Sequence, residues 1–230
     1  MSCTGPKEVW HPKFQDRLPT EDNIVDVTGA AKLQFSYAIT TRDRVQQKQQ
    51  VPHVVWLTGL PSAGKSTIAN ACDVRLTGMG FHCVVLDGDD LRQGLTGDLG
   101  FSEEDRAENV RRVGEVARLC FAAGLIVFVA LVSPFRDDRD RVRGLFDAGS
   151  FSEVFVTTPL DTCVDRDTKG LYARAAAHRV VDMTGVGQRY ETPLDAAIEV
   201  DGAGDLKTVA DQLVQYLLER VGEQRGSNGS

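Results

Sequence analysis

The feature that most constrains the fold is an eight-residue run of mostly small residues. Residues 59–66 read GLPSAGKS and fit the pattern G-x-x-x-x-G-K-[ST]. An apolar run typical of a buried strand, VVWLTG at 54–59, comes directly before it, and a helical stretch to about Gly78 follows. A strand, a glycine-rich turn and a helix in this order point successive backbone N–H groups inward around phosphate oxygens. The chain is therefore expected to hold a phosphate-binding loop (P-loop) inside an α/β domain.

Apolar runs and helical stretches alternate along the rest of the chain. Further strands are expected at 81–89, 125–132, 153–157 and near 197–200. Further helices are expected at 103–123, near 137–148 and at about 205–222. Alternating strands and helices imply a parallel sheet covered on both faces. The predicted fold class is α/β, the three-layer P-loop NTPase fold with a central, mainly parallel sheet flanked by helices.

Composition divides the chain into three parts. Residues 1–50 contain prolines, mixed charges and the polar run QQKQQ without sustained periodicity, so they are expected to form an N-terminal arm that is partly irregular. Residues 51–222 are expected to form the P-loop domain, and a chain that is 42% hydrophobic can give it one full core. Residues 223–230 are expected to be a disordered tail.

Charge and cysteine usage exclude several classes of protein. A net charge of −7 argues against broad binding to nucleic acid, and no apolar run is long enough to span a membrane. Five scattered cysteines without a C-x-x-C pair indicate reduced thiols rather than disulfides or a zinc site. The N-terminus lacks the apolar core of a secretory signal, so a cytoplasmic protein is expected, with an organellar stroma or matrix left open.

The P-loop assigns roles to several side chains. Lys65 is expected to reach the β- and γ-phosphates of ATP, and the Ser66 hydroxyl to bind Mg²⁺. Nucleotide contacts are expected from Gly59, Ser62, Ala63, Gly64, Lys65, Ser66 and Thr67. A GTPase would carry an N/T-K-x-D motif, and the nearest run, TKGL at 168–171, lacks the aspartate. A small-molecule kinase is the class that remains favoured.

Three acidic residues lie where the second predicted strand ends, in the run LDGDD at 86–90. This is the carboxyl edge of the sheet, where α/β proteins bind ligands. One carboxylate there could hold Mg²⁺, and another could orient a hydroxyl or accept its proton. The alternative is a solvated turn or a helix N-cap, since aspartate is favoured in both.

The same segments resemble the adenylylsulfate kinase family. The resemblance lies in DGDDLR (87–92), DLGFS (98–102), DRAENVRRVGE (105–115), SPFR (133–136), RDTKGLY (166–172), TG (184–185), YETP (190–193) and TRDR (41–44). It covers about residues 38–220, in order and at the family's spacing. Such a match implies transfer of phosphate from ATP to the 3′-hydroxyl of adenylyl sulfate, giving 3′-phosphoadenylyl sulfate and ADP for sulfate assimilation.

The resemblance also implies roles for single residues. Asp89 becomes the base or orienter of the acceptor hydroxyl and Asp87 the carboxylate linked to Mg²⁺, with the order of the two left open. A lid is implied at about 163–192, from which Arg166 would contact ATP. Acceptor contacts are implied for Asp89, Arg92, Phe101, Arg106, Asn109, Ser133, Lys169 and Met183. The alternatives are a core position for Phe101 and helix ion pairs for Arg106, Arg111 and Arg112.

The chain departs from the family pattern mainly on the acceptor and lid side. Asp90 replaces an asparagine, Thr168 a proline and Met183 a phenylalanine, and the turn GQR at 187–189 replaces one that contains an acid. A kinase for another nucleotide-like acceptor therefore stays open. So does a weakly catalytic, nucleotide-sensing regulatory module that uses the arm to engage a partner. The family implies a homodimer, and a functional link to an ATP sulfurylase is open.

Overall fold

The central feature of the molecule is a five-stranded sheet. The computed structural model describes residues 24–26, 33–35, 37–167, 170–176, 184–185 and 187–227. The strands are β3 (His53–Thr58), β4 (Cys83–Asp87), β5 (Ile126–Ala130), β6 (Phe151–Val156) and β7 (Ile198–Val200). Their order is β4-β5-β3-β6-β7 and every pairing is parallel, so the predicted fold class is confirmed. The P-loop strand β3 lies in the middle, where both neighbours shield it from water.

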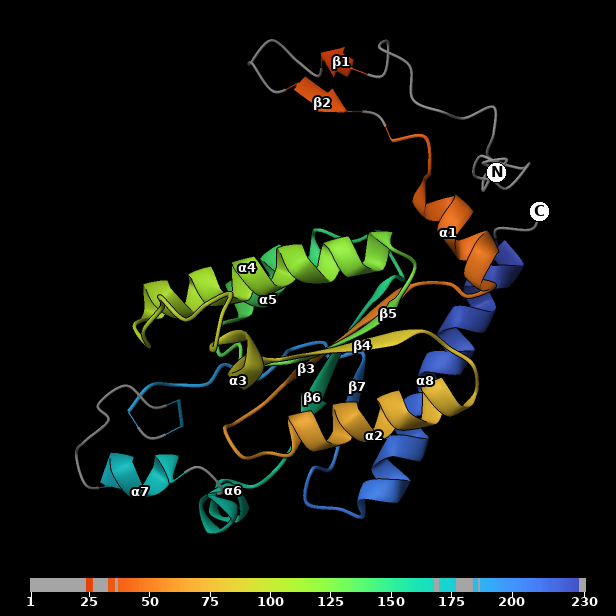
Figure 1. Cartoon of the computed structure of the whole chain (residues 1–230). Coiled ribbons are helices and arrows are strands. Elements are labelled where there is room, and N and C mark those ends of the chain that lie inside the picture. Colours follow the sequence, from red (N-terminus) through yellow and green to blue (C-terminus); the bar gives the residue numbers. More distant parts are fainter. Residues whose placement is uncertain are drawn as a thin grey trace, which may run out of the picture.

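Helices cover both faces of this sheet (Figure 1). One face packs against α2 (Lys65–Gly78) and α8 (Leu206–Ser227), and the other against α4 (Glu103–Ala122) and α5 (Arg136–Arg143). Alternate residues of β3 serve the two layers: Val55 and Leu57 belong to the first core cluster, and Val54 and Trp56 to the second. All four side chains are at most 1% exposed. The three-layer arrangement follows from this two-sided burial.

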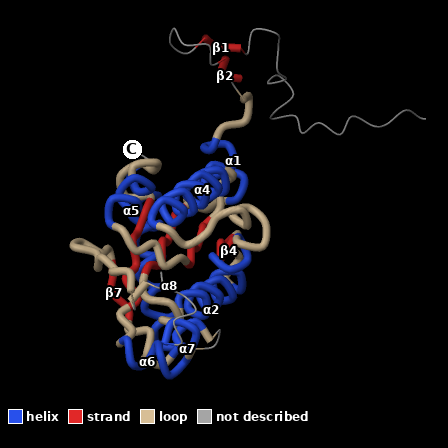
Figure 2. Tube along the Cα trace, turned by 90° about the vertical axis from the view of Figure 1, so that its left-hand side faces the viewer, coloured by secondary structure: helices blue, strands red, loops and turns tan. Residues whose placement is uncertain are grey.

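Short helices gather at the carboxyl edge of the sheet. They are α3 (Gly88–Leu91) after β4, α6 (Leu160–Arg166) after β6, and α7 (Leu171–Ala176). Figure 2 looks onto this edge and shows α6 and α7 side by side at one end of it. Both lie in or next to the segment that is expected to act as a lid. The loops that could bind ligands are therefore collected on one side of the molecule.

The described parts of the arm contain regular structure. β1 (Ile24–Asp26) pairs antiparallel with β2 (Leu33–Phe35), and α1 (Thr41–Lys48) begins with a capping box. Gln50, which is 2% exposed, then donates to the carbonyls of His82 and Gly124. This side chain ties the end of the arm to the amino-terminal edge of the sheet. The boundary between arm and domain stays a prediction.

Two predicted helix ends need correction. α8 continues to Ser227, past its predicted end at about 222. The disordered tail stays a prediction, and residues 228–230 lie outside the described residues. α5 ends at Arg143 instead of 148, because Gly144 caps it and the next backbone amides turn back onto Val142 and Arg143. Among the described residues, no helix has the length and apolar character to cross a membrane.

Candidate active site

A cavity of about 790 Å³ opens at the carboxyl edge of the sheet. It is bounded by the P-loop, the start of α3, the Phe101 loop, α4, the end of β5 and the lid helices. The predicted site residues among its lining are Ser62, Ala63, Gly64, Lys65, Ser66, Thr67, Asp89, Arg92, Phe101, Arg106, Asn109, Ser133 and Arg166. Gly59 and Asp87, which are also predicted site residues, are not part of this lining. Lys65 and Asp89, which are 24 positions apart in the sequence, face one space.

The P-loop is held in shape by its own backbone and by its neighbours. Gly64 has φ +98°, and a Cβ on Gly59 would lie 2.8 Å from the Val156 carbonyl oxygen. Lys65 is 8% exposed and donates from Nζ to the carbonyls of Gly59 (3.0 Å) and Leu60 (2.6 Å). These contacts place a buried ammonium group beside inward-facing backbone amides. The arrangement suits a bound phosphate chain.

The acidic strand end separates its carboxylates. Asp87 caps α3, since its Oδ1 accepts from the Asp89 amide at 2.9 Å, while its buried Oδ2 has no hydrogen-bond partner among the described residues. The N-cap alternative therefore holds for Asp87, with one oxygen left over. Asp89 is exposed and lines the cavity. Of the two acids, Asp89 is the one that lines the cavity.

Phe101 is 51% exposed at the rim of the cavity, which rules out the core alternative. The guanidinium carbons of Arg92 and Arg106 lie 4.4 and 5.5 Å from the centre of its ring. Arg92 also donates to the carbonyls of Leu99 and Gly100, and Arg106 donates to that of Phe101. Burial lowers the pKa of Arg92, and the nearby Asp105 charge opposes part of that shift. An aromatic ring with two cations beside it suits a planar, anionic ligand.

Three polar residues form the inner wall. Asn109 and Thr184 are 7% and 1% exposed, and the Asn109 Oδ1 and Thr184 Oγ1 atoms have no partner among the described residues. Ser133 is 3% exposed, and its hydroxyl bonds Trp56 and Thr58 within the fold. Its contact with a ligand would therefore come through the backbone. Thr184 was not predicted as a site residue, although it lies in the TG pair that carries part of the resemblance.

Arg111 and Arg112 lie outside the cavity lining. Arg111 bonds Glu108, while Arg112 bonds both Glu108 and Asp98. Hydrogen bonds from the two arginines lower the pKa of Glu108 to about 2. Both arginines are surface ion-pair residues, as the alternative interpretation has it.

The lid region contributes further cations. Arg166 donates to the Gly202 carbonyl at 2.8 Å, and Arg174, which was not predicted, also lines the cavity. Tyr172 ties α7 to the P-loop through a 3.1 Å bond to the Pro61 carbonyl. Lys169 and Met183 lie outside the described residues. Within the described part of the chain, five cationic side chains therefore line this cavity of an acidic protein: Lys65, Arg92, Arg106, Arg166 and Arg174.

Comparison with known proteins agrees with this geometry. Residues 51–201 match the family model "Adenylylsulphate kinase". An adenylyl-sulfate kinase of Shewanella pealeana is 50% identical over 182 residues, which are 79% of this chain and 89% of that protein. One of Marinobacter nauticus is 49% identical over 185 residues, or 80% and 93% of the two chains.

Solved structures also place this chain among kinases of this fold. The APS kinase CysC of Mycobacterium tuberculosis, in complex with AMPPNP and APS, superposes with a TM-score of 0.70 at 40% identity over 73% of this chain and 98% of its own. A gluconokinase of Sinorhizobium meliloti, at 15% identity and a TM-score of 0.52, shares the fold alone. On the strength of the family model and relatives near 50% identity, the chain belongs to the adenylylsulfate kinase family.

Proposed function

We propose that this protein transfers the γ-phosphoryl group of MgATP to the 3′-hydroxyl of adenylyl sulfate. The products are 3′-phosphoadenylyl sulfate and ADP, so the enzyme activates sulfate for assimilation. The observation that carries the proposal is the single cavity in which Lys65 and Asp89 both lie, surrounded by cations. Relatives near 50% identity carry the name of this activity.

The donor half of the cavity fits ATP with Mg²⁺. Backbone amides of residues 59–67 and the Lys65 ammonium group would hold the phosphate oxygens. Ser66 lines the cavity and is exposed, and one buried carboxylate oxygen of Asp87 has no partner in the described part of the chain, so both residues could bind Mg²⁺ directly or through water. Bound Mg²⁺ would neutralise charge on the transferring group.

The acceptor half of the cavity, which is the part lined by Asp89, Arg92, Phe101, Arg106, Asn109 and Ser133, fits adenylyl sulfate. Asp89 orients the 3′-hydroxyl and takes its proton as the oxygen attacks the γ-phosphorus atom, and the bond to the β-phosphate oxygen breaks to release ADP. Arg92, Arg106 and Asn109 bind the phosphosulfate and the ribose, and Phe101 stacks on the adenine. Positioning and charge stabilisation, rather than covalent catalysis, provide the rate enhancement.

The lid closes the site from the β6 side. Arg166 contacts ATP, Lys169 neutralises charge at the phosphates, and Met183 covers the acceptor adenine through its polarisable sulfur. The partners proposed for the protein are a second copy of itself, as a homodimer, and an ATP sulfurylase that supplies the acceptor. An APS kinase of Thiobacillus denitrificans is hexameric, which supports self-association in general, and a relative in Azospirillum brasilense is named bifunctional enzyme NodQ.

An acceptor panel tests this proposal. Purified protein with saturating MgATP is given adenylyl sulfate, adenosine 5′-monophosphate or adenosine, and both ADP formation and the phosphorylated product are measured. Adenylyl sulfate should give the highest kcat/KM and a product with the new phosphate on the 3′-oxygen. A higher kcat/KM for another acceptor, for which Asp90 and Met183 leave room, would reject the assignment.

A further inference from the structure

A buried arginine lies just outside the cavity without lining it. Arg139, in α5, is 1% exposed, and its Nε bonds the Oε1 atom of Glu153, itself 3% exposed, at 2.5 Å. Buried ion pairs are rarely more stabilising than apolar residues of the same shape, because both charges lose their hydration. The pair therefore calls for a role other than stability, and the remaining contacts of the guanidinium group indicate one.

Arg139 joins two segments that border the cavity. Its Nη1 donates to the Ser133 carbonyl and its Nη2 to the Glu191 carbonyl, each at 2.7 Å. Ser133 follows β5, lines the cavity and has φ +38°, a left-handed conformation that costs a non-glycine residue energy. Such a conformation persists only where its surroundings hold it. The guanidinium group is one of those surroundings.

The second segment is the stretch that returns from the lid, residues 187–192, which we call the lid return. Its Glu191 amide donates to the Pro134 carbonyl at 2.9 Å, and its Gln188 side chain donates to the Phe101 carbonyl at 3.2 Å. The lid return therefore contacts both the loop after β5 and the loop that carries Phe101. Its position sets the distance between these two walls of the acceptor half.

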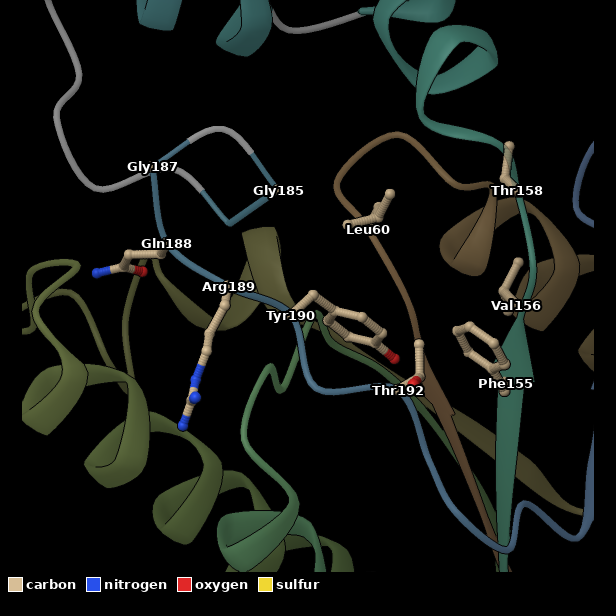
Figure 3. Close-up of a pocket in the computed structure, with 10 residues that line it drawn as sticks. All are labelled: Leu60, Phe155, Val156, Thr158, Gly185, Gly187, Gln188, Arg189, Tyr190 and Thr192. Atoms are coloured by element: carbon tan, nitrogen blue, oxygen red, sulfur yellow. The ribbon is translucent and has the colours of Figure 1, made fainter.

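A chain of buried polar groups runs beside the guanidinium group. The Trp56 indole donates to the Ser133 hydroxyl (3.1 Å), which donates to the Thr58 hydroxyl (3.1 Å), and Thr58 shares a 2.9 Å hydrogen bond with the Tyr190 hydroxyl. The Tyr190 ring stacks on Phe155, with ring centres 6.0 Å apart (Figure 3). The chain connects the same two segments a second time, at the residue directly before the P-loop.

We propose that Arg139 is a positioning residue for phosphoryl transfer: it fixes the Ser133 wall against the lid return and so sets the shape of the acceptor half. Glu153 keeps the guanidinium group oriented by bonding Nε, which leaves the other two nitrogens for the two carbonyls. Only a planar fork can make these three contacts at once, so lysine is a poor substitute. The kinetic test of this inference rests on the proposed function, because it uses adenylyl sulfate as the acceptor. The structural test depends only on the observed contacts.

The kinetic test compares Arg139→Met and Arg139→Lys with Arg143→Met. Arg143 bonds the other oxygen of Glu153, and in the described structure it bonds neither carbonyl, so it is the matched control. Both Arg139 variants should lose about tenfold or more in kcat/KM for adenylyl sulfate, while the KM for ATP stays within about threefold. Arg143→Met should keep both constants near wild type. Tyr190→Phe, which leaves the ion pair intact, should show a smaller loss in the same direction.

The structural test is hydrogen exchange at the Glu191 amide, which needs no acceptor. Protection there should fall in both Arg139 variants and stay in Arg143→Met. A wild-type protein without activity on adenylyl sulfate would refute the proposed function and leave the exchange result to decide this inference. If Arg139→Lys keeps wild-type kcat/KM and wild-type protection, or if Arg143→Met loses as much as Arg139→Met, the inference is overturned.

Discussion

Gly202 packs so closely against the P-loop that a single added methyl group should destabilise the domain and disturb the ATP site. A Cβ added there would lie 2.2 Å from Thr158 Oγ1, 2.3 Å from the Ala63 carbonyl oxygen and 2.6 Å from a Val156 methyl carbon. Thr158 donates to that same Ala63 carbonyl at 2.7 Å, and Arg166 donates to the Gly202 carbonyl. Gly202→Ala therefore pushes apart the P-loop, the end of β6 and the lid arginine.

The size of the effect follows from these contacts. Overpacking a well-filled site costs about 1–3 kcal/mol, and losing the Thr158–Ala63 hydrogen bond adds about 1 kcal/mol. A total of about 2–4 kcal/mol should lower the Tm by about 5–15 °C in a domain of this size. The KM for ATP should rise because Ala63 belongs to the P-loop, while the KM for adenylyl sulfate should change less.

The assay is a thermal melt followed by steady-state kinetics well below the Tm. Gly222→Ala is the control, since nothing lies within 4 Å of a Cβ at that helical position. It should leave the KM for ATP unchanged and raise the Tm slightly. A Gly202→Ala protein with the Tm and ATP affinity of wild type would refute the claim that this glycine is required by close packing.

Three further predictions concern the site and the core. Lys65→Met should lower kcat by about 10²–10³-fold with an unchanged circular dichroism spectrum, because it removes the ammonium group that stabilises the transferring phosphate. Gln188→Ala should raise the KM for adenylyl sulfate about fivefold, the value of one hydrogen bond, through its lost contact with Phe101. Burial and the nearby Arg220 charge lower the pKa of His53 from 6.5 to about 4, so the unfolded chain gains a proton first as the pH falls. Stability attributable to His53 should be constant above pH 6.5 and fall by about 3 kcal/mol on the way to pH 4. Urea titrations of His53→Gln and wild type at several pH values measure that difference, and parallel curves would contradict it.

Most helices and strands could be predicted from the sequence, because caps and apolar periodicity are local signals. The helix predicted at 103–123 is observed at Glu103–Ala122, since Ser102 caps it and the apolar period is regular. β6 begins at Phe151, two residues before the predicted start at 153. The polar Ser152 hides this start in the sequence, because a buried strand tolerates a serine only where its hydroxyl is hydrogen-bonded, here to His53 and Tyr216. Contacts of that kind join residues far apart in the chain and leave no local pattern.

In the candidate site, too, local sequence signals were predictable and contacts between distant residues were not. Lys65 and Asp89 could be predicted because each follows a strand of one parallel sheet, whose carboxyl ends meet at a single edge. The burial of Arg139 and Glu153 could not, since charged residues are ordinarily exposed and the two elements meet only in the folded chain. Arg174 joins the cavity through the lid, whose path no periodicity predicts.

The central claim is that Asp89 faces the acceptor hydroxyl across the cavity from Lys65, and a pair of isosteric variants tests it most directly. Asp89→Asn should lower kcat with adenylyl sulfate by about 10² or more, because the amide cannot take the proton. Asp90→Asn, the neighbouring exposed acid outside the cavity lining, should stay near wild type. Equal activity of the two variants would contradict the account.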